Sequence, residues 1–198
     1  VCYSIAPWTN SVVYYDEATK TTVKKRLTPG SEEWTTIWTA FLNDLADHLY
    51  EKGWFNDAYI GIDERGFNKA AFDLIDSIKR GIPTPLKLKS AGAMDGFVEK
   101  KDLAMRVDDL NVGSIAVKAH PQQFEEIRQA REDAGLRTTI YTCTGHKPGN
   151  FSLSAPGESY WTMMYSYSVG GEGYLRWAYD SWVENPLEDT THNAFEDR

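Results

Sequence analysis

The stretch Tyr59-Ile60-Gly61-Ile62-Asp63-Glu64-Arg65-Gly66 decides the fold class of this chain. An apolar run stops at two adjacent carboxylates, a glycine follows, and a helical pattern begins at about Asn68. This pattern is typical of a buried parallel strand that carries Asp63 and Glu64 at its C-terminal end. Ligands and reacting groups gather at that end in α/β folds, so the two carboxylates are candidate functional residues.

Strand and helix patterns alternate on both sides of this stretch. Strands are expected within 1–8, 86–91, 112–118, 137–143 and 173–179, and a hairpin at 12–15 and 21–25. Helices are expected between the N-cap Ser31 and the stop at Gly53, and at 68–79, 99–110, 120–135 and 158–169. The tryptophans of the first helix share a face with Leu and Ile, which indicates core packing rather than a ligand platform.

Such alternation predicts parallel strands joined by crossover helices. We count about six such strands, against eight in a closed barrel. A dinucleotide fold is disfavoured because no glycine-rich phosphate loop follows any strand. The sequence therefore predicts an α/β fold of the (β/α)8 TIM-barrel type that lacks its first two strands. Residues 1–198 would be a single domain, the C-terminal part of a catalytic barrel with an acidic tail from about 185, and further domains are expected before Val1.

Composition excludes several classes of protein. The chain has 198 residues, 41% of them hydrophobic and 25% charged, which is ordinary globular composition. Its formal net charge is -8, and its only basic run is Lys24-Lys25-Arg26, so no nucleic-acid partner is expected. No apolar run is long enough to span a membrane. No residue pattern here indicates where in or outside the cell the protein acts.

Cysteine and metal chemistry are also disfavoured. Cys2 and Cys143 lie too far apart in the sequence to form a disulfide framework and are interpreted as small buried hydrophobes. His146 follows Cys143 closely, and a thiol–imidazole pair is retained as a minor alternative. No cluster has metal-ligand spacing and no Gly-x-Ser-x-Gly elbow is present, so we expect no metal, no cofactor and no serine nucleophile.

In a barrel the tips of all parallel strands converge on one face. That face would gather Trp8, Asp63, Glu64, Met94, Asp95, His120, Tyr141, His146, Trp177, Tyr179, Asp180 and Trp182. Aromatic faces stack on sugar rings, carboxylates bind hydroxyl groups, and glycosidic cleavage needs a carboxylic acid to protonate the leaving oxygen. The predicted partner is therefore a glycan, with Trp8, Tyr141, His146, Trp177, Tyr179 and Trp182 as candidate substrate-binding residues.

Two adjacent carboxylates fit one mechanism better than another. A conventional retaining glycosidase places two carboxyls about 5–5.5 Å apart across the scissile bond, which neighbouring residues at a strand tip do poorly. In substrate-assisted hydrolysis the 2-acetamido oxygen is the nucleophile. Asp63 would then hold the amide N–H, and Glu64 would be the acid/base.

Other interpretations of the Asp-Glu pair and of the whole chain stay open at this point. The Asp-Glu pair alone is also found at solvated loop starts, or as a partner for a cation such as Arg65. The chain could be a carbohydrate-binding barrel without catalysis. It could also be a conventional retaining glycosidase whose nucleophile is Asp95, Asp180 or a carboxylate elsewhere.

Three segments together resemble the catalytic barrel of glycoside hydrolase family 123. They are Trp54-Phe55 running into 60–65, Tyr141-Thr-Cys-Thr-Gly145, and Gly173-Tyr-Leu-Arg-Trp177-Ala-Tyr179-Asp-Ser-Trp182. The resemblance implies a barrel, usually preceded by β-sandwich domains, and exo-acting β-N-acetylgalactosaminidase activity with retention by substrate assistance.

The resemblance also implies residue roles. Asp63 matches the aspartate that orients the acetamido group, and Glu64 matches the acid/base. Tyr141, Trp177, Tyr179 and Trp182 match the aromatic region by segment. Arg65 stands where the family commonly has proline, a departure expected to alter the loop and the subsite beyond the cleaved sugar.

Overall fold

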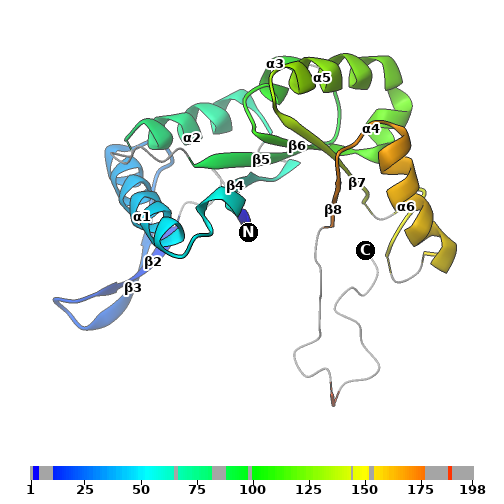
Figure 1. Ribbon diagram of the computed structural model, residues 1–198. Helices are drawn as coiled ribbons and strands as arrows, with labels where there is room; N and C mark the ends of the chain where they lie inside the picture. The colour runs from blue at the N-terminus through cyan, green and yellow to red at the C-terminus, as the bar shows by residue number, and fades with distance from the viewer. Residues whose placement is uncertain are drawn as a thin grey trace.

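The computed structural model describes residues 2–4, 11–64, 67–81, 88–97, 100–143, 145–151, 154–176 and 187–188. Six parallel strands form one sheet in the order β1-β4-β5-β6-β7-β8 (Figure 1). They are β1 Cys2–Ser4, β4 Tyr59–Ile62, β5 Lys89–Met94, β6 Asp109–Gly113, β7 Arg137–Tyr141 and β8 Tyr174–Leu175. Each strand is parallel to its neighbours, so all carboxyl ends lie at one edge of the sheet.

The predicted (β/α)8 barrel is wrong for this chain. In the residues that the structure describes, the sheet is open, with β1 and β8 as its two edge strands, and a separate two-stranded antiparallel sheet accompanies it. Alternation of strands and helices predicts parallel strands with crossover connections. Closure also depends on strand tilt and shear, and hydrophobic periodicity reports neither of these.

The helices alternate with the strands, as expected. They are α1 Glu32–Glu51, α2 Lys69–Gly81, α3 Lys101–Ala104, α4 Ser114–Ala119, α5 Pro121–Asp133 and α6 Pro156–Ser168, with a 3-10 turn η1 at Phe55–Asp57. The predicted start of α1 is confirmed, because Ser31 Oγ accepts a hydrogen bond of 3.2 Å from the Trp34 amide. Trp34 is 1% exposed, which confirms a core role. No helix among the described residues has the length and apolarity to cross a membrane.

The predicted hairpin is also confirmed. β2 Ser11–Asp16 and β3 Thr21–Arg26 pair antiparallel and extend away from the main sheet beside α1 (Figure 1). Asp16 Oδ1 accepts hydrogen bonds from the amides of Ala18 and Thr19, at 2.8 and 3.3 Å, which stabilises the turn.

Three predicted boundaries are wrong in the middle of the chain. The strand predicted at 112–118 is instead the end of β6 followed by α4, because Ser114, Ala116 and Val117 are buried at helical spacing. Of the helix predicted at 99–110 only α3 is helical, and its last two residues belong to β6. The strand predicted at 86–91 is β5, shifted by three residues so that it ends at Met94.

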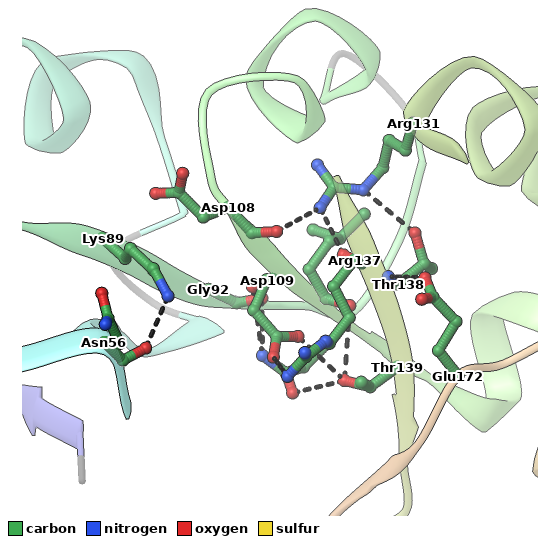
Figure 2. A network of polar contacts seen from close by, with 12 residues as sticks. Asn56, Lys89, Gly92, Asp108, Asp109, Arg131, Arg137, Thr138, Thr139 and Glu172 are labelled. Atoms are coloured by element: carbon green, nitrogen blue, oxygen red, sulfur yellow. Dashed lines mark hydrogen bonds and ion pairs between the residues drawn. The ribbon is translucent and has the colours of Figure 1, made fainter. Parts of the chain in front are cut away.

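The two faces of the sheet differ in polarity. Ile62, Met94, Val112 and Ile140 lie in one apolar cluster with side chains of α2, α4 and α5, and α2 and α5 run along that side of the sheet in Figure 1. The opposite face of β6 and β7 is polar. There Thr139 Oγ1 donates to Asn111 Oδ1 at 2.6 Å (Thr139 is labelled in Figure 2).

A buried arginine fixes the amino ends of the same two strands (Figure 2). Arg131, from the last turn of α5, is 0% exposed. Its guanidinium donates to Thr138 Oγ1 at 3.0 Å, to the carbonyls of Val107 and Asp108 at 3.0 and 3.2 Å, and also to those of Ala104 and Arg137. The guanidinium therefore joins α5 to the chain entering β6 and to the start of β7.

Candidate active site

The site begins where β4 ends. Ile60 and Ile62 are buried on the helix side, and Asp63 and Glu64 follow directly and are half-buried. Asp63 Oδ1 accepts a hydrogen bond of 2.8 Å from the backbone amide of Glu64. This bond orients the Asp63 carboxylate relative to the backbone of Glu64. The prediction that this strand delivers both carboxylates to the carboxyl edge is consistent with this geometry.

Glu64 is in contact with two residues from the end of β7. Tyr141 Oη donates a short hydrogen bond to Glu64 Oε1, and Cys143 Sγ donates to the same oxygen at 3.6 Å. Strands β5 and β6 lie between β4 and β7 in the sheet, a separation of about 14 Å across a flat sheet. The contact therefore depends on the curvature of the sheet, which brings the strand tips together.

A glycine makes room for the tyrosine. Gly113 ends β6 and stands opposite Tyr141 in the register of β6 and β7. A Cβ at Gly113 would lie 3.2 Å from Tyr141 Oη and 3.3 Å from its Cζ. The absent side chain lets the Tyr141 ring pass over the end of β6 towards Glu64.

Both donors keep their protons at neutral pH. Burial raises the pKa of Tyr141, and the hydrogen bond to Glu64 raises it further. Burial, followed by the charge of Glu64, raises the pKa of Cys143 to about 11. A thiol held in its neutral form is a poor nucleophile, which argues against catalysis by Cys143.

His146 lies close enough to Glu64 for the Glu64 charge to affect the His146 pKa. The imidazole Nδ1 of His146 is 3.1 Å from Ser114 Oγ, whereas only the backbone amide of His146 bonds to Cys143, at its carbonyl. Partial burial lowers the pKa of His146, and the Glu64 charge works in the opposite direction. The thiol–imidazole pair retained from the sequence is therefore not formed in this structure.

The other strand-tip residues divide into three groups. The charge of Asp95 raises the pKa of both Tyr141 and Cys143, which places it near the site, and its carboxylate is ion-paired to Lys100 Nζ at 2.6 Å. Met94 is 0% exposed within the apolar cluster, and His120 is exposed beyond α4 with its ring against Phe97. Trp8, Trp177, Tyr179, Asp180 and Trp182 lie outside the described residues.

The loop after β7 is braced by a tyrosine from the neighbouring strand. Tyr174 Oη donates to Asn150 Oδ1 at 3.1 Å and is hydrogen-bonded to Thr142 Oγ1. These bonds connect β8, the end of β7 and the loop that carries His146. No group of three or more potential metal ligands occurs in the part of the chain that the structure describes.

Two residues of the site, Cys143 and Gly113, were not predicted from the sequence. Cys143 was interpreted as a buried hydrophobe, and Gly113 was placed inside a strand. A usable signal was present for Cys143, because Tyr141 and Cys143 are two residues apart at a strand end and so point to the same side. Gly113 gives no such signal, since its role depends on a residue 28 positions later in the chain.

An open parallel α/β sheet with paired carboxylates at its carboxyl edge is an arrangement typical of enzymes that bind ligands at that edge. Comparison with known proteins makes the class specific. A family model described as the catalytic domain of glycoside hydrolase 123 matches residues 1–197, and the chain belongs to this family. The family predicted from the sequence is confirmed. No curated protein matches the chain.

A solved structure agrees with the family model. It comes from work on glycolipid glycan hydrolysis by a family 123 glycoside hydrolase from Clostridium perfringens. The two proteins are 39% identical, with a TM-score of 0.78, over 94% of this chain and 32% of the other. The chain thus spans about a third of the length of that relative.

Proposed function

We propose that the protein is a glycosidase that hydrolyses the glycosidic bond of a 2-acetamido sugar with retention, in the manner of a β-N-acetylgalactosaminidase. Membership of glycoside hydrolase family 123 supports the general reaction. The observation that carries the proposal is the pair Asp63 and Glu64 at the carboxyl end of β4, both half-buried, with Asp63 Oδ1 accepting a hydrogen bond from the Glu64 amide.

The reaction divides between the two carboxyl groups. The acetamido oxygen of the substrate attacks C1 while Asp63 accepts a hydrogen bond from the acetamido N–H. Glu64 gives its proton to the leaving oxygen as the C1–O bond breaks, and a cyclic oxazolinium-like intermediate forms. Glu64 then takes a proton from water, the water oxygen attacks C1, and the ring of the intermediate opens.

The environment of Asp95 supports a substrate-derived nucleophile. In a conventional retaining enzyme a second carboxylate must attack C1. Asp95 is near Glu64, but its side chain is 58% exposed and paired with Lys100. The acetamido oxygen is already tethered to the reacting sugar, so its attack needs no protein nucleophile.

The test is hydrolysis by the full-length protein of chromogenic β-N-acetylgalactosaminide and β-N-acetylglucosaminide beside the plain galactoside and glucoside. We expect cleavage of the acetamido sugars alone. We also expect the rate to fall steadily as fluorine replaces hydrogen on the acetamido methyl, since fluorine weakens the carbonyl oxygen as a nucleophile. Efficient cleavage of plain sugars, with loss of activity in Asp95→Asn, would contradict substrate assistance.

Variants assign the two roles. Glu64→Gln is expected to lower kcat about 10²- to 10⁴-fold, the usual contribution of a general acid. Asp63→Asn is expected to lower it strongly on acetamido substrates, with an unchanged circular dichroism spectrum. Asp47→Asn, an exposed change on α1, is the matched control and should behave as the parent protein.

A further inference from the structure

We infer that Tyr141 and Cys143 are positioning residues that hold one oxygen of Glu64, Oε1, so that the other oxygen, Oε2, carries the proton to the leaving group. This inference rests on the proposed role of Glu64 as the acid/base. It assigns to Tyr141 a role other than contact with the sugar, and it gives a role to a thiol that the proposed reaction does not otherwise use.

The geometry of β7 places both donors on one carboxylate. Tyr141 is the last residue of β7, and Cys143 follows two positions later, so both side chains point to the same side of the strand end. Thr142, between them, is instead bonded to Tyr174. The two donors approach the same atom, Glu64 Oε1, from a strand that is not adjacent to β4.

The protonation states support donation in one direction. The pKa of Tyr141 and that of Cys143 are both raised, so the hydroxyl and the thiol remain protonated across the pH range in which a glycosidase works. A protonated phenol or thiol next to a carboxylate oxygen donates its hydrogen. Two donors therefore occupy the two lone pairs of Oε1.

This occupation selects the oxygen that is protonated. In a neutral carboxylic acid the carbonyl oxygen accepts hydrogen bonds and the hydroxyl oxygen bears the proton. With both donors on Oε1, that atom takes the carbonyl role and the proton resides on Oε2. The contacts also restrict rotation of the side chain, which keeps Oε2 directed towards one position of the leaving oxygen.

Such a role has a kinetic signature that sugar binding lacks. Protonation matters most for a poor leaving group, because a good one departs as an anion without help. The loss of rate caused by a poorly positioned acid must therefore grow as the leaving group becomes more basic. Loss of a contact to the sugar itself lowers the rate by a similar factor for every leaving group.

The experiment uses the full-length protein and a series of aryl N-acetyl-β-galactosaminides from dinitrophenyl to methylumbelliferyl, with the corresponding alkyl glycoside added. Tyr141→Phe is expected to lower kcat/KM about 10- to 100-fold on the poorest leaving group, as for loss of a hydrogen bond to a charged group, and only a few-fold on dinitrophenyl. Cys143→Ala is expected to show the same trend with a smaller effect, because a thiol is a weak donor. Cys143→Ser should largely restore the parent behaviour.

Tyr165→Phe is the matched control, because Tyr165 is a half-buried tyrosine on α6 that packs against the core away from Glu64. An equal loss for all leaving groups in Tyr141→Phe, or no loss at all, would overturn the inference. Glu64→Gln is measured in the same series. If Glu64→Gln keeps full activity, the proposed function itself fails, whereas a leaving-group-dependent loss in Glu64→Gln without one in Tyr141→Phe refutes only the positioning role.

Discussion

A single methyl group added at Gly113 tests whether the passage of Tyr141 over the end of β6 controls the acid. The backbone at Gly113 has φ -62° and ψ 130°, which alanine adopts without strain. The new Cβ would lie 3.2 Å from Tyr141 Oη and 3.3 Å from Cζ, both closer than the 3.4 Å at which ordinary contact begins. The tyrosine ring must therefore yield by a few tenths of an ångström.

The stability cost of Gly113→Ala should be small. Overpacking of a core typically costs about 1–3 kcal/mol, and one methyl group at these distances belongs at the lower end. Replacing glycine by alanine offsets about 0.4–1 kcal/mol through the unfolded chain. The net loss is about 0–1 kcal/mol, which corresponds to a fall in Tm of no more than about 4 °C for a domain of this size.

The effect of Gly113→Ala on turnover should be larger than its effect on stability. A misplacement of about 1 Å can cost about 10²-fold in rate, so a shift of a few tenths of an ångström suggests about a 3- to 10-fold loss of kcat/KM on a glycoside with a poor leaving group. In the Tyr141→Phe background the closest contact is absent, and the same substitution should have less effect. Gly157→Ala on α6, where a Cβ would meet no atom within 4 Å, is the control. If Gly113→Ala lowers kcat/KM by the same factor in the parent protein and in the Tyr141→Phe variant, the steric reasoning is refuted.

Two further outcomes follow from the described contacts. Arg131→Met removes the guanidinium from four carbonyls and a hydroxyl, and should lower the free energy of unfolding in urea by at least about 3 kcal/mol. Arg128→Met on the same helix, where the arginine pairs with the exposed Glu125 and Glu132, should lower it by under about 1 kcal/mol. Similar losses for the two variants would contradict the network. Because its pKa is about 11, Cys143 should react with iodoacetamide at pH 8 about 100-fold more slowly than in the urea-unfolded chain, and its rate should rise about tenfold per pH unit up to that pKa. Peptide mass spectrometry would report this rate, and equal rates in the folded and unfolded chains would show that the thiol is not held in its neutral form.

Local sequence was sufficient to predict the origin of the site. The apolar residues before Asp63 identified a buried strand, and parallel strands place all their carboxyl ends at one edge, so Glu64, Tyr141 and His146 were expected near one another. The charges and contacts of these residues agree with that expectation. The family was predicted on three short segments and is confirmed over residues 1–197.

Contacts that depend on curvature could not be predicted in the same way. Tyr141 and Glu64 are 77 residues apart and belong to strands separated by two others. Whether their side chains meet depends on how far the sheet curves, and whether the sheet closes depends on strand number and shear. For the same reason the predicted barrel was wrong while the parallel order of its strands was right. The strand predicted for the segment after Gly113 was wrong for a local reason. A short apolar run fits a strand and a buried helix equally well.

The register of β6 and β7 links stability to the proposed chemistry. The two strands pair from Asp109↔Arg137 to Gly113↔Tyr141. A slip of one residue would send Tyr141 to the helix side of the sheet, away from Glu64. A slip of two residues would keep the correct face but would place Tyr141 beside a residue with a side chain instead of Gly113.

Two features at a distance from the site oppose such slips. Arg131 binds the carbonyls of Asp108 and Arg137, which fixes the amino ends of both strands relative to each other. The buried bond from Thr139 to Asn111 forms only in the observed register. Buried polar groups that satisfy one another specify one arrangement more sharply than apolar contacts, which tolerate sliding. The amino half of β6 and β7 thus determines where the tips of these strands place Tyr141 and Cys143, and through them the orientation of Glu64.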